Sequence, residues 1–501
     1  MTRRTTVLVV GAGPCGLAMA AQLSRLGVQV TVVDAADQPH TGSRAILLWP
    51  PVREVLGELG LAERAAREAI QPVALHYHLG SGGSVRVPLS DVNAPLVLPQ
   101  ERTGRLLAEA LADRGVGVEW GTRVTKVVPD EHTVTVTATR ADGSTTEFEA
   151  DWLVGADGLH SRVRAELGID FTGARFPATF LLAEGRITGE PGTGWSADEV
   201  HYFLGDTGTA VLAPLPGGEF RISGAVPEGT PATAEQAQVL LDERGPGGLR
   251  FTEVRTVTLF SSDERVAGAL RSGRCFLVGD AAHVHSPIGG QGLSLGIPDT
   301  RNLAWKLAGV VHGRLNPSIL DSYDPERRAA IAQTLQATGR MARQAVAGPA
   351  ARRVRDLSWR LLGASGALAR GYAPLLAGWR SRYPDVLFGT GPADRPQRSR
   401  PRPGTRDPRW LPHPSDELAG RFQLLTYGGP HSRLAQDAAE LAGSLPGLVA
   451  HFPLAGPRQR FVLLRPDGHV AASGEAGRFP AVAARLAALA ATPPSPSSGT
   501  P

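Results

Sequence analysis

A glycine-rich turn near the N-terminus constrains the fold of this chain more than any other feature. The apolar run Thr5 to Val10 leads into Gly11-Ala12-Gly13-Pro14-Cys15-Gly16, and an amphipathic segment follows from about Gly16 to Leu26. A second apolar run, Val28 to Asp34, ends in an acid. This order of strand, glycine turn, helix and strand predicts a βαβ unit with a buried parallel sheet.

Each glycine of this turn has a physical reason at its position. Gly11 permits the tight turn, Gly13 lets the backbone approach a pyrophosphate, and Gly16 allows the helix to pack closely on the strand. Phosphates would meet free N–H groups at the positive end of the helix dipole. A dinucleotide is therefore expected at Gly11, Gly13, Pro14 and Gly16, with Asp34 on its ribose. The turn does not by itself separate FAD from NAD.

Composition limits the class of protein. With 501 residues, 42% hydrophobic and 20% charged, the chain is expected to be globular with two or three domains. The net charge of +4 is small and no dense arginine run carries interleaved aromatics, so we expect no nucleic-acid partner. Glycines and a proline interrupt the first apolar run, and no uninterrupted apolar stretch of about 18 residues or more is present, so we predict no membrane span and a cytoplasmic location. Cys15 and Cys275 are too few for a disulfide framework or a four-ligand zinc site.

The order of predicted elements indicates a discontinuous first domain. Residues 1–175 and 265–345 have an α/β pattern, whereas 176–264 show the short, punctuated strands of an antiparallel sheet, which residues 70–100 partly join. Residues 346–395 are expected to form a helical connector, and a Pro- and Arg-rich stretch then leads to a smaller α/β unit at 396–490. The tail 491–501 is predicted to be disordered.

Two later motifs have the same strand–turn–helix form. Residues 151–164 are DWLVGADGLHSRVR, and residues 274–292 are RCFLVGDAAHVHSPIGGQG. Singly, each Asp-Gly or Gly-Asp pair is compatible with an ordinary turn. In this order, the three motifs resemble the single-component FAD-dependent aromatic hydroxylases of the p-hydroxybenzoate hydroxylase fold, and among them the aromatic-polyketide hydroxylases of bacteria. The resemblance covers residues 5–345 well and the C-terminal unit more loosely.

The resemblance implies an architecture for the whole chain. It comprises a Rossmann-like FAD-binding domain, an inserted antiparallel β-sheet substrate domain and a C-terminal thioredoxin-like domain. Because no cysteine follows Cys275, thiol redox chemistry is excluded in the last of these, and packing or oligomerisation is expected instead.

The resemblance also implies cofactor contacts at the motif positions. Gln100 matches a glutamine that contacts the cofactor, although a solvated residue at a helix start is an open alternative. Asp157 matches a position near the pyrophosphate that is linked to NAD(P)H, and Asp280 matches the carboxylate that holds the ribityl chain, although it could simply cap a helix. The flavin ring is expected along Arg44, Gly279, Pro287, Gly289, Gly290, Gly292, Leu293 and Ser294, with Arg44, Pro287 and Gly289 at its reacting part.

The implied function is hydroxylation of an aromatic, polyketide-like small molecule with O2 and NADPH or NADH. In this family oxygen transfer proceeds through a flavin C4a-hydroperoxide. Baeyer–Villiger oxygen insertion, dehydrogenation, and a non-catalytic flavin-binding module stay open as alternatives. Substrate is expected between the flavin and the antiparallel sheet, where His201, Tyr202 and Arg221, with His76 and His78, are polar candidates that surface or structural roles also explain. No metal site is predicted, and a homodimer is left open.

The chain also departs from the family pattern. Leu293-Ser294 stands where Met or Leu followed by Asn is common, Pro298 precedes Asp299 where Gln is frequent, and Gly104 replaces a frequent acid. Pro298 lacks a backbone donor, so we expect these changes to affect flavin placement and not the identity of the cofactor.

Overall fold

A parallel sheet of the Rossmann type forms the centre of the molecule. The computed structural model describes residues 2–491 except 43–44, 81, 193, 206, 286–289, 346–348, 390–400 and 411–414. The sheet contains, in spatial order, β17 (Cys275–Leu277), β10 (Thr145–Gly155), β1 (Thr2–Val10), β2 (Val30–Val33) and β7 (Val118–Glu119), all parallel. β16 (Arg271–Ser272) adds to one edge, and β8 (Thr122–Pro129) and β9 (Val134–Arg140) extend β10 as antiparallel strands. A hairpin turn at residues 141–143 joins β9 to β10.

Three helices pack together beside this sheet. They are α1 (Pro14–Arg25), α4 (Gln100–Ala112) and α7 (Gly292–Val311). α1 begins two residues earlier than predicted because the fixed φ of proline suits the first position of a helix. Leu17, Met19 and Leu23 of α1 are buried in the largest apolar core, together with Leu8 and Val32 of the strands. Burial of that apolar surface stabilises the domain and fixes where the strands end.

A second sheet lies beyond the first and is the predicted insertion. Its order is β18 (His283–Val284), β15 (Leu249–Ala267), β11 (Phe171–Gly189), β14 (Glu219–Val226), β13 (Gly208–Leu215), β12 (Val200–Gly205), β4 (Ala74–Leu79) and β5 (Ser84–Pro88). β4 and β5 come from the region 70–100, outside the inserted segment itself, and pair with each other in this sheet. The expectation of a wholly antiparallel sheet is wrong at one place, because β12 pairs with β4 in parallel after a long crossover.

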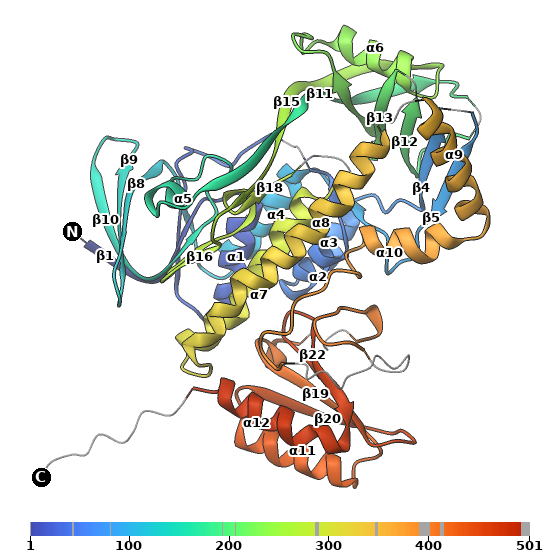
Figure 1. Ribbon diagram of the computed structural model, residues 1–501. Coiled ribbons are helices and arrows are strands. Elements are labelled where there is room, and N and C mark those ends of the chain that lie inside the picture. The colour runs from blue at the N-terminus through green and yellow to red at the C-terminus, as the bar shows by residue number, and fades with distance from the viewer. Residues whose placement is uncertain are drawn as a thin grey trace, which may run out of the picture.

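The two faces of the second sheet are covered by different helices. α6 (Ala234–Arg244), which sequence analysis missed, packs on the face that lies away from the first domain (Figure 1). The opposite face packs on residues 46–49 and on a helical segment that contains η3 (Leu368–Tyr372) and α10 (Ala373–Leu376). We call these the outer face and the inner face. The inner face is the one turned toward the first domain.

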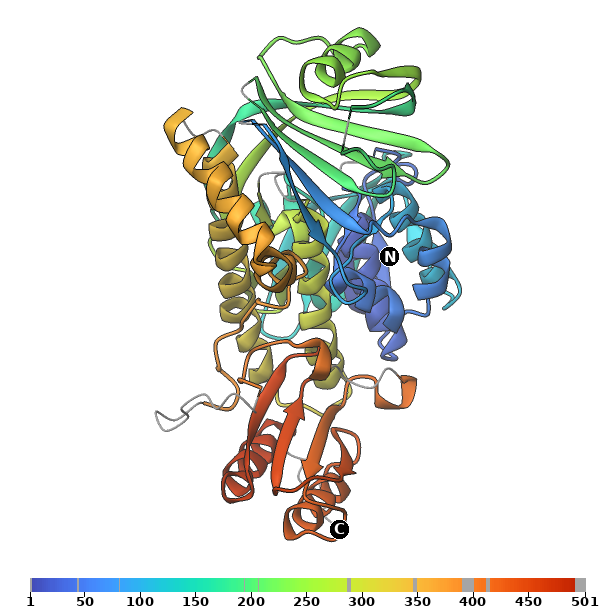
Figure 2. The ribbon, with the colours of Figure 1, turned by 90° about the vertical axis from the view of Figure 1, so that its right-hand side faces the viewer.

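Long helices and a small α/β unit complete the chain. The two long helices are α8 (Tyr323–Ala345) and α9 (Pro349–Ala364). The C-terminal unit contains β19 (Phe422–Tyr427), α11 (Arg433–Ser444), β20 (Val449–Leu454), β21 (Arg460–Leu464), β22 (Val470–Glu475) and α12 (Phe479–Leu489). Figure 2 shows this unit on the opposite side of the first domain from the second sheet. Among the described residues, no helix is long and apolar enough to cross a membrane.

Candidate functional site

Three motifs that are far apart in the sequence meet at one edge of the central sheet. Gly11 follows β1, Asp157 follows β10 after one residue, and Gly279 follows β17 after one residue. Backbone bonds hold the strand ends together: the Gly11 N–H donates to the Val33 carbonyl at 2.8 Å, and the Ala156 N–H donates to the Val10 carbonyl at 2.7 Å. Ligands of open α/β sheets bind at the carboxyl ends of the strands, so this edge is the expected binding site.

The glycines of the first turn differ in what surrounds them. Gly11 has a φ of +105°, and a Cβ there would lie 2.4 Å from the Ala156 carbonyl oxygen. A Cβ on Gly16 would lie 1.9 Å from the Gly11 carbonyl oxygen. At Gly13 a Cβ would meet nothing within 4 Å. The first two glycines therefore allow the turn to form, whereas Gly13 borders an open space at the start of α1, as a pyrophosphate requires.

Asp34 links the end of β2 to this turn. Its Oδ2 accepts a hydrogen bond from the Ala12 N–H at 2.5 Å, and its Oδ1 accepts one from the Ala36 N–H at 2.8 Å. The carboxylate is thus held beside the backbone that approaches the phosphates. From there it can accept hydrogen bonds from a ribose as well.

The turn after β17 is packed tightly against α1 and α7. Gly279 has a φ of +61°, and a Cβ on Gly279 or on Gly296 would lie 2.7 Å from the Cys15 Sγ. Burial, with the nearby Asp280 and Asp299 carboxylates, raises the pKa of the Cys15 thiol well above its usual value, so this cysteine is a neutral packing residue. Asp280 is exposed and lies in a short 3-10 helix, η1 (Gly279–Ala281), which follows β17 at the sheet edge.

The start of α7 faces the same region. Gly292 is its first residue, Leu293 is buried, and the Ser294 hydroxyl lies 3.3 Å from the Trp49 N–H that donates to it. Gly290 has a φ of +61°. Pro287 and Gly289, which were expected to line the flavin, lie outside the described residues. Pro298 lies in the second turn of α7 and not at its start.

Gln100 and Asp157 both bond to protein groups. Gln100 clamps Ala45, since the Ala45 N–H donates to Gln100 Oε1 at 3.2 Å and the Gln100 N–H donates to the Ala45 carbonyl at 3.0 Å. Gln100 thereby fixes the segment that follows Arg44, a residue outside the described part of the chain. Asp157 Oδ2 accepts from the N–H groups of Arg162 and Val163 at 2.7 and 3.0 Å, so it caps α5 (Arg162–Glu166).

The sheet-edge geometry agrees with comparisons to known protein families. Residues 4–338 match the model of the FAD binding domain family. The chain belongs to this family. It is 34% identical to 6-methylpretetramide 4-monooxygenase of Streptomyces rimosus over 96% of this chain and 93% of that protein. It is also 32% identical to 12-dehydrotetracycline 5-monooxygenase/anhydrotetracycline 6-monooxygenase of the same species, over 93% of this chain and 95% of the relative.

Solved structures extend the likeness over nearly the whole chain. The flavin-dependent monooxygenase PieE, solved with FAD and substrate, superposes with a TM-score of 0.77 at 26% identity and covers 97% of this chain and 99% of its own. The anhydrotetracycline hydroxylase OxyS of Streptomyces rimosus superposes with a TM-score of 0.74 at 30% identity, covering 94% and 96%. The protein is an FAD-dependent monooxygenase, and the predicted family and cofactor are confirmed.

The second sheet of this flavoprotein separates the five predicted substrate residues. His201 pairs with His76 across β12 and β4, and successive residues of a strand point to opposite faces. His76, His78 and His201 therefore lie on the outer face, where the Trp195 ring stacks on His201 at 4.4 Å. The prediction that these three histidines face the flavin is therefore wrong, because the alternation of side chains along the strands places them on the other face of the sheet. Tyr202 is on the inner face.

The three histidine rings stack in one cluster, in which His78 and His201 are hydrogen-bonded to each other. The His201 Nε2–H donates to the Ser196 carbonyl at 2.8 Å, which leaves Nδ1 to accept from His78 Nε2 at 3.0 Å. His76 bonds Glu199 and Ser84 through its two nitrogens at 2.9 and 2.8 Å. One nitrogen from each ring lies within 4.8 Å of the others, but the His76 and His78 rings are stacked at 17°, so their lone pairs do not converge on one ion. Burial lowers the pKa of His78 to about 4, which keeps this imidazole neutral.

Arg221 and Tyr202 lie on the inner face in different settings. The Tyr202 ring stacks on Tyr77 at 4.8 Å, and Tyr77 packs against Trp359 of α9, so this aromatic group is covered by helices. Arg221 is buried, and its Nε donates to Glu184 Oε1 at 2.9 Å. Further along the inner face, toward β18, the rings of Phe180 and Phe260 stack at 5.5 Å.

Sequence analysis missed three residues that support the Gly279 turn. Asp299 Oδ2 accepts from the Gly279 N–H at 2.9 Å, and Arg327 donates to Asp299 Oδ1 at 2.6 Å. Arg164 donates to the Ala281 carbonyl at 2.8 Å. The available signal for Asp299 was that it is the one acidic residue of the helix after the glycine loop, which also carries Arg301 and Lys306. The two arginines gave none, because arginine is frequent throughout this chain.

Proposed function

We propose that this FAD-dependent monooxygenase hydroxylates an aromatic polyketide of the tetracycline type. The chain is similar over more than nine-tenths of its length to 6-methylpretetramide 4-monooxygenase and to 12-dehydrotetracycline 5-monooxygenase/anhydrotetracycline 6-monooxygenase, and this similarity supports the substrate class. The observation that carries the proposal is the convergence of three strand ends around the open space at Gly13, because it fits an extended dinucleotide.

The residues present fit FAD in one orientation. Its diphosphate would lie over Gly11, Gly13, Pro14 and Gly16, with Asp34 on the ribose and Asp280 on the ribityl chain. Gly279, Gly290, Gly292, Leu293 and Ser294 would border the flavin ring, and Gln100 would act through Ala45. Arg44, Pro287 and Gly289 are proposed at the reacting part. The Ser294 hydroxyl would hold the backbone beside the flavin in place and would not bond to the flavin directly, because it already accepts a hydrogen bond from the Trp49 N–H.

The substrate would lie between the flavin ring and the inner face of the second sheet. Bound FAD supplies the oxygen-transfer chemistry after reduction by NADPH or NADH and reaction with O2. The stacked Phe180 and Phe260 offer aromatic surface to a flat polycyclic ligand and exclude water. Arg221, held by Glu184, would orient a phenolate or carbonyl oxygen of that ligand. Tyr202, which the helices cover, would support the wall of the substrate site by packing and would not contact the substrate.

The absorption spectrum of the purified protein is the first test. Bands of oxidised flavin are expected, and NADPH or NADH should bleach them faster when an anhydrotetracycline-type aromatic compound is present. The product should gain one oxygen atom on a ring carbon, as mass spectrometry and NMR would show. A colourless protein that takes up no added FAD would end the proposal.

Product analysis also separates the alternatives. Baeyer–Villiger insertion adds one oxygen but changes the ring connectivity, whereas dehydrogenation adds none. A non-catalytic flavin-binding module would oxidise no NADPH or NADH with any aromatic ligand.

We further propose that the C-terminal unit is thioredoxin-like. Its strand order β20-β19-β21-β22, with β19 and β20 parallel and the others antiparallel, supports this proposal, as do its two helices. The domain boundaries predicted from the sequence, the cytoplasmic location and a homodimer stay predictions. Analytical ultracentrifugation of the holoprotein would test the last of these.

A further inference from the structure

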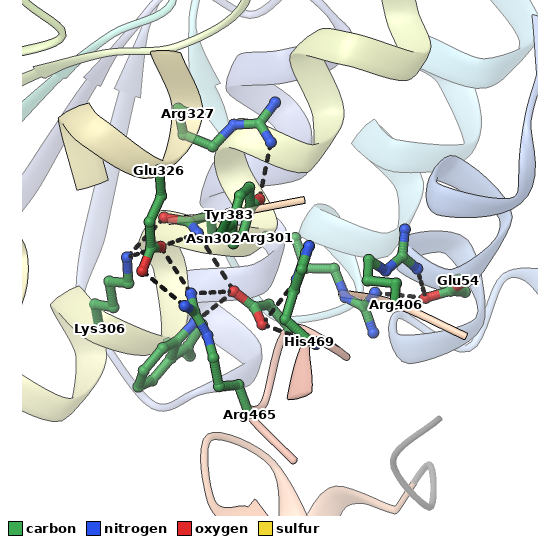
Figure 3. Close-up of polar contacts among 12 residues, drawn as sticks. Glu54, Arg301, Asn302, Lys306, Glu326, Arg327, Tyr383, Arg406, Arg465 and His469 are labelled. Atoms are coloured by element: carbon green, nitrogen blue, oxygen red, sulfur yellow. Dashed lines mark hydrogen bonds and ion pairs between the residues drawn. The ribbon is translucent and has the colours of Figure 1, made fainter. Parts of the chain in front are cut away.

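A charged hairpin turn of the C-terminal unit packs against helices of the first domain. The turn between β21 and β22 carries Arg465, Asp467 and His469, which are all buried although they lie on a loop. Charged residues are almost never fully buried unless they are paired. Figure 3 shows Arg465 and His469 beside polar side chains of α7 and α8.

The first set of partners fixes the hairpin to both helices. Arg465 forms a two-pronged ion pair with Glu326 of α8 at 2.7 and 2.8 Å, and it also pairs with Asp467 at 2.6 Å. Glu326 in turn accepts from Lys306 of α7 at 2.7 Å. Although burial acts to raise it, the pKa of Glu326 is held at about 2 by Arg465 and Lys306, so the cluster stays charged.

The second set of partners leads toward the flavin turn. The His469 ring stacks on Tyr383 with centroids 3.9 Å apart. The backbone of Tyr383 is tied to the same unit, because its N–H donates to Gly404, whose own N–H donates to Val470 of β22. The Tyr383 hydroxyl accepts a hydrogen bond from Arg327 at 2.8 Å, as Figure 3 shows.

Arg327 connects Tyr383 to the turn that carries Asp280. It is almost fully buried and donates through Nε to Asp299 Oδ1 at 2.6 Å and through another nitrogen to the Leu295 carbonyl at 2.9 Å. The other oxygen of Asp299 accepts from the Gly279 N–H at 2.9 Å and lies 2.8 Å from His283 Nε2. Asp299 therefore clamps both ends of the segment 279–283.

Stability alone gives a weak reason for these charges. Replacing a buried ion pair by apolar residues is often neutral or stabilising, whereas a fully satisfied polar network fixes one geometry. Here every step from the hairpin to Gly279 is a direct contact between buried groups, and the last one bonds the backbone next to Asp280.

We propose that Tyr383, Arg327 and Asp299 are positioning residues through which the C-terminal hairpin holds the FAD-binding turn in its binding geometry. This inference rests on the proposed placement of the FAD ribityl chain at Asp280. The C-terminal unit then contributes to the flavin site without touching the cofactor.

Affinity for FAD in single variants is the first measurement. The apoprotein of each variant is titrated with FAD, and the visible circular dichroism of the bound flavin is recorded. Tyr383→Phe keeps the stacking on His469 and removes only the hydroxyl, so it should fold normally. We expect Tyr383→Phe and Asp299→Asn to raise the Kd for FAD by about threefold to thirtyfold, which corresponds to about 0.7–2 kcal/mol of coupling, and to change the flavin dichroism.

Arg406→Gln is the matched control. Arg406 belongs to the same C-terminal part and forms a buried ion pair with Glu54 at 2.5 Å, but it has no contact with Tyr383, Arg327 or Asp299 among the described interactions. This variant should lower the melting temperature while the Kd for FAD stays within twofold. In the double variant Tyr383→Phe/Asp299→Asn, the two effects on Kd should not add, because they act on one path.

Two results would overturn the proposal. One is an unchanged Kd and flavin dichroism in both Tyr383→Phe and Asp299→Asn, and the other is an equal loss of FAD affinity in Arg406→Gln. Asp280→Ala separates this outcome from failure of the proposed function. Full FAD affinity in Asp280→Ala would contradict the proposed position of the cofactor itself. If Asp280→Ala weakens FAD binding but Tyr383→Phe and Asp299→Asn do not, only the proposed role of the hairpin is wrong.

Discussion

The edge of the central sheet and the inner face of the second sheet contribute to the site by different means. At the edge, each contribution comes from a short continuous motif, such as Gly11 to Gly16, whose backbone shape is set locally. On the second sheet the contributions come from single side chains, and Arg221 and Glu184 meet only because β14 pairs with β11 in one register. A motif therefore identifies the first kind of region, whereas strand pairing and parity determine the second.

The glycines of the first turn give the largest expected effect. Gly16→Val should prevent the turn from forming, because its Cβ would lie 1.9 Å from the Gly11 carbonyl oxygen. We expect little soluble protein and no bound flavin, measured by yield and by the absorption ratio of flavin to protein.

Gly13→Ala is the informative partner of that variant. The backbone at Gly13, with φ −68° and ψ 174°, accepts alanine, and the new Cβ would meet no protein atom. The melting temperature of the apoprotein should be unchanged, while FAD affinity falls at least tenfold because the methyl group occupies the place of the phosphates. Unaltered FAD affinity would show that the pyrophosphate does not pass over Gly13.

The Arg221–Glu184 pair tests the inner face. Arg221→Met leaves a buried carboxylate with one partner fewer, and breaking a buried ion pair costs about 3 kcal/mol of unfolding free energy. Arg255 contacts the same Glu184 but its side chain is 45% exposed, so Arg255→Met should cost less than about 1 kcal/mol. Urea denaturation of both variants makes the comparison. Equal losses would mean that burial does not distinguish the two arginines.

These two regions also show how far the sequence could predict the molecule. Strand, turn and helix at Gly11–Gly16 follow from local chemistry, whereas FAD as the cofactor was predicted from the resemblance that the three motifs carry together. The histidines at 76, 78 and 201 were placed on the wrong face, because an alternating strand does not reveal which face meets the flavin until its partners are known. Asp299 was missed as a support for the same reason, since its bond to Gly279 joins residues of two elements whose packing only the fold defines.

The outer-face histidines predict a pH dependence of stability. The pKa of His78 is lowered to about 4 by burial and by His76 and His201, against about 6.5 in the unfolded chain. Between these values the unfolded state binds more protons, so the stability contributed by neutral His78 is present above pH 6.5 and is lost as the pH falls toward 4. His78→Gln should flatten the fall in melting temperature between pH 6.5 and 4, whereas His431→Gln, at an exposed position, should not. Parallel pH profiles for His78→Gln and the unaltered protein would contradict the buried cluster.

The smallest expected effect concerns Asp157, which belongs to a sequence motif but whose observed contacts are made by its side chain. Its motif resembles a cofactor contact, yet its carboxylate caps α5 through the N–H groups of Arg162 and Val163. Asp157→Ala should cost about 1 kcal/mol of unfolding free energy, as the loss of a helix cap does. It should also raise the Kd for FAD less than threefold, well below the effect of Asp280→Ala. A loss of FAD affinity equal to that of Asp280→Ala would mean that Asp157 holds the cofactor directly, and that its bonds to α5 give way when FAD binds.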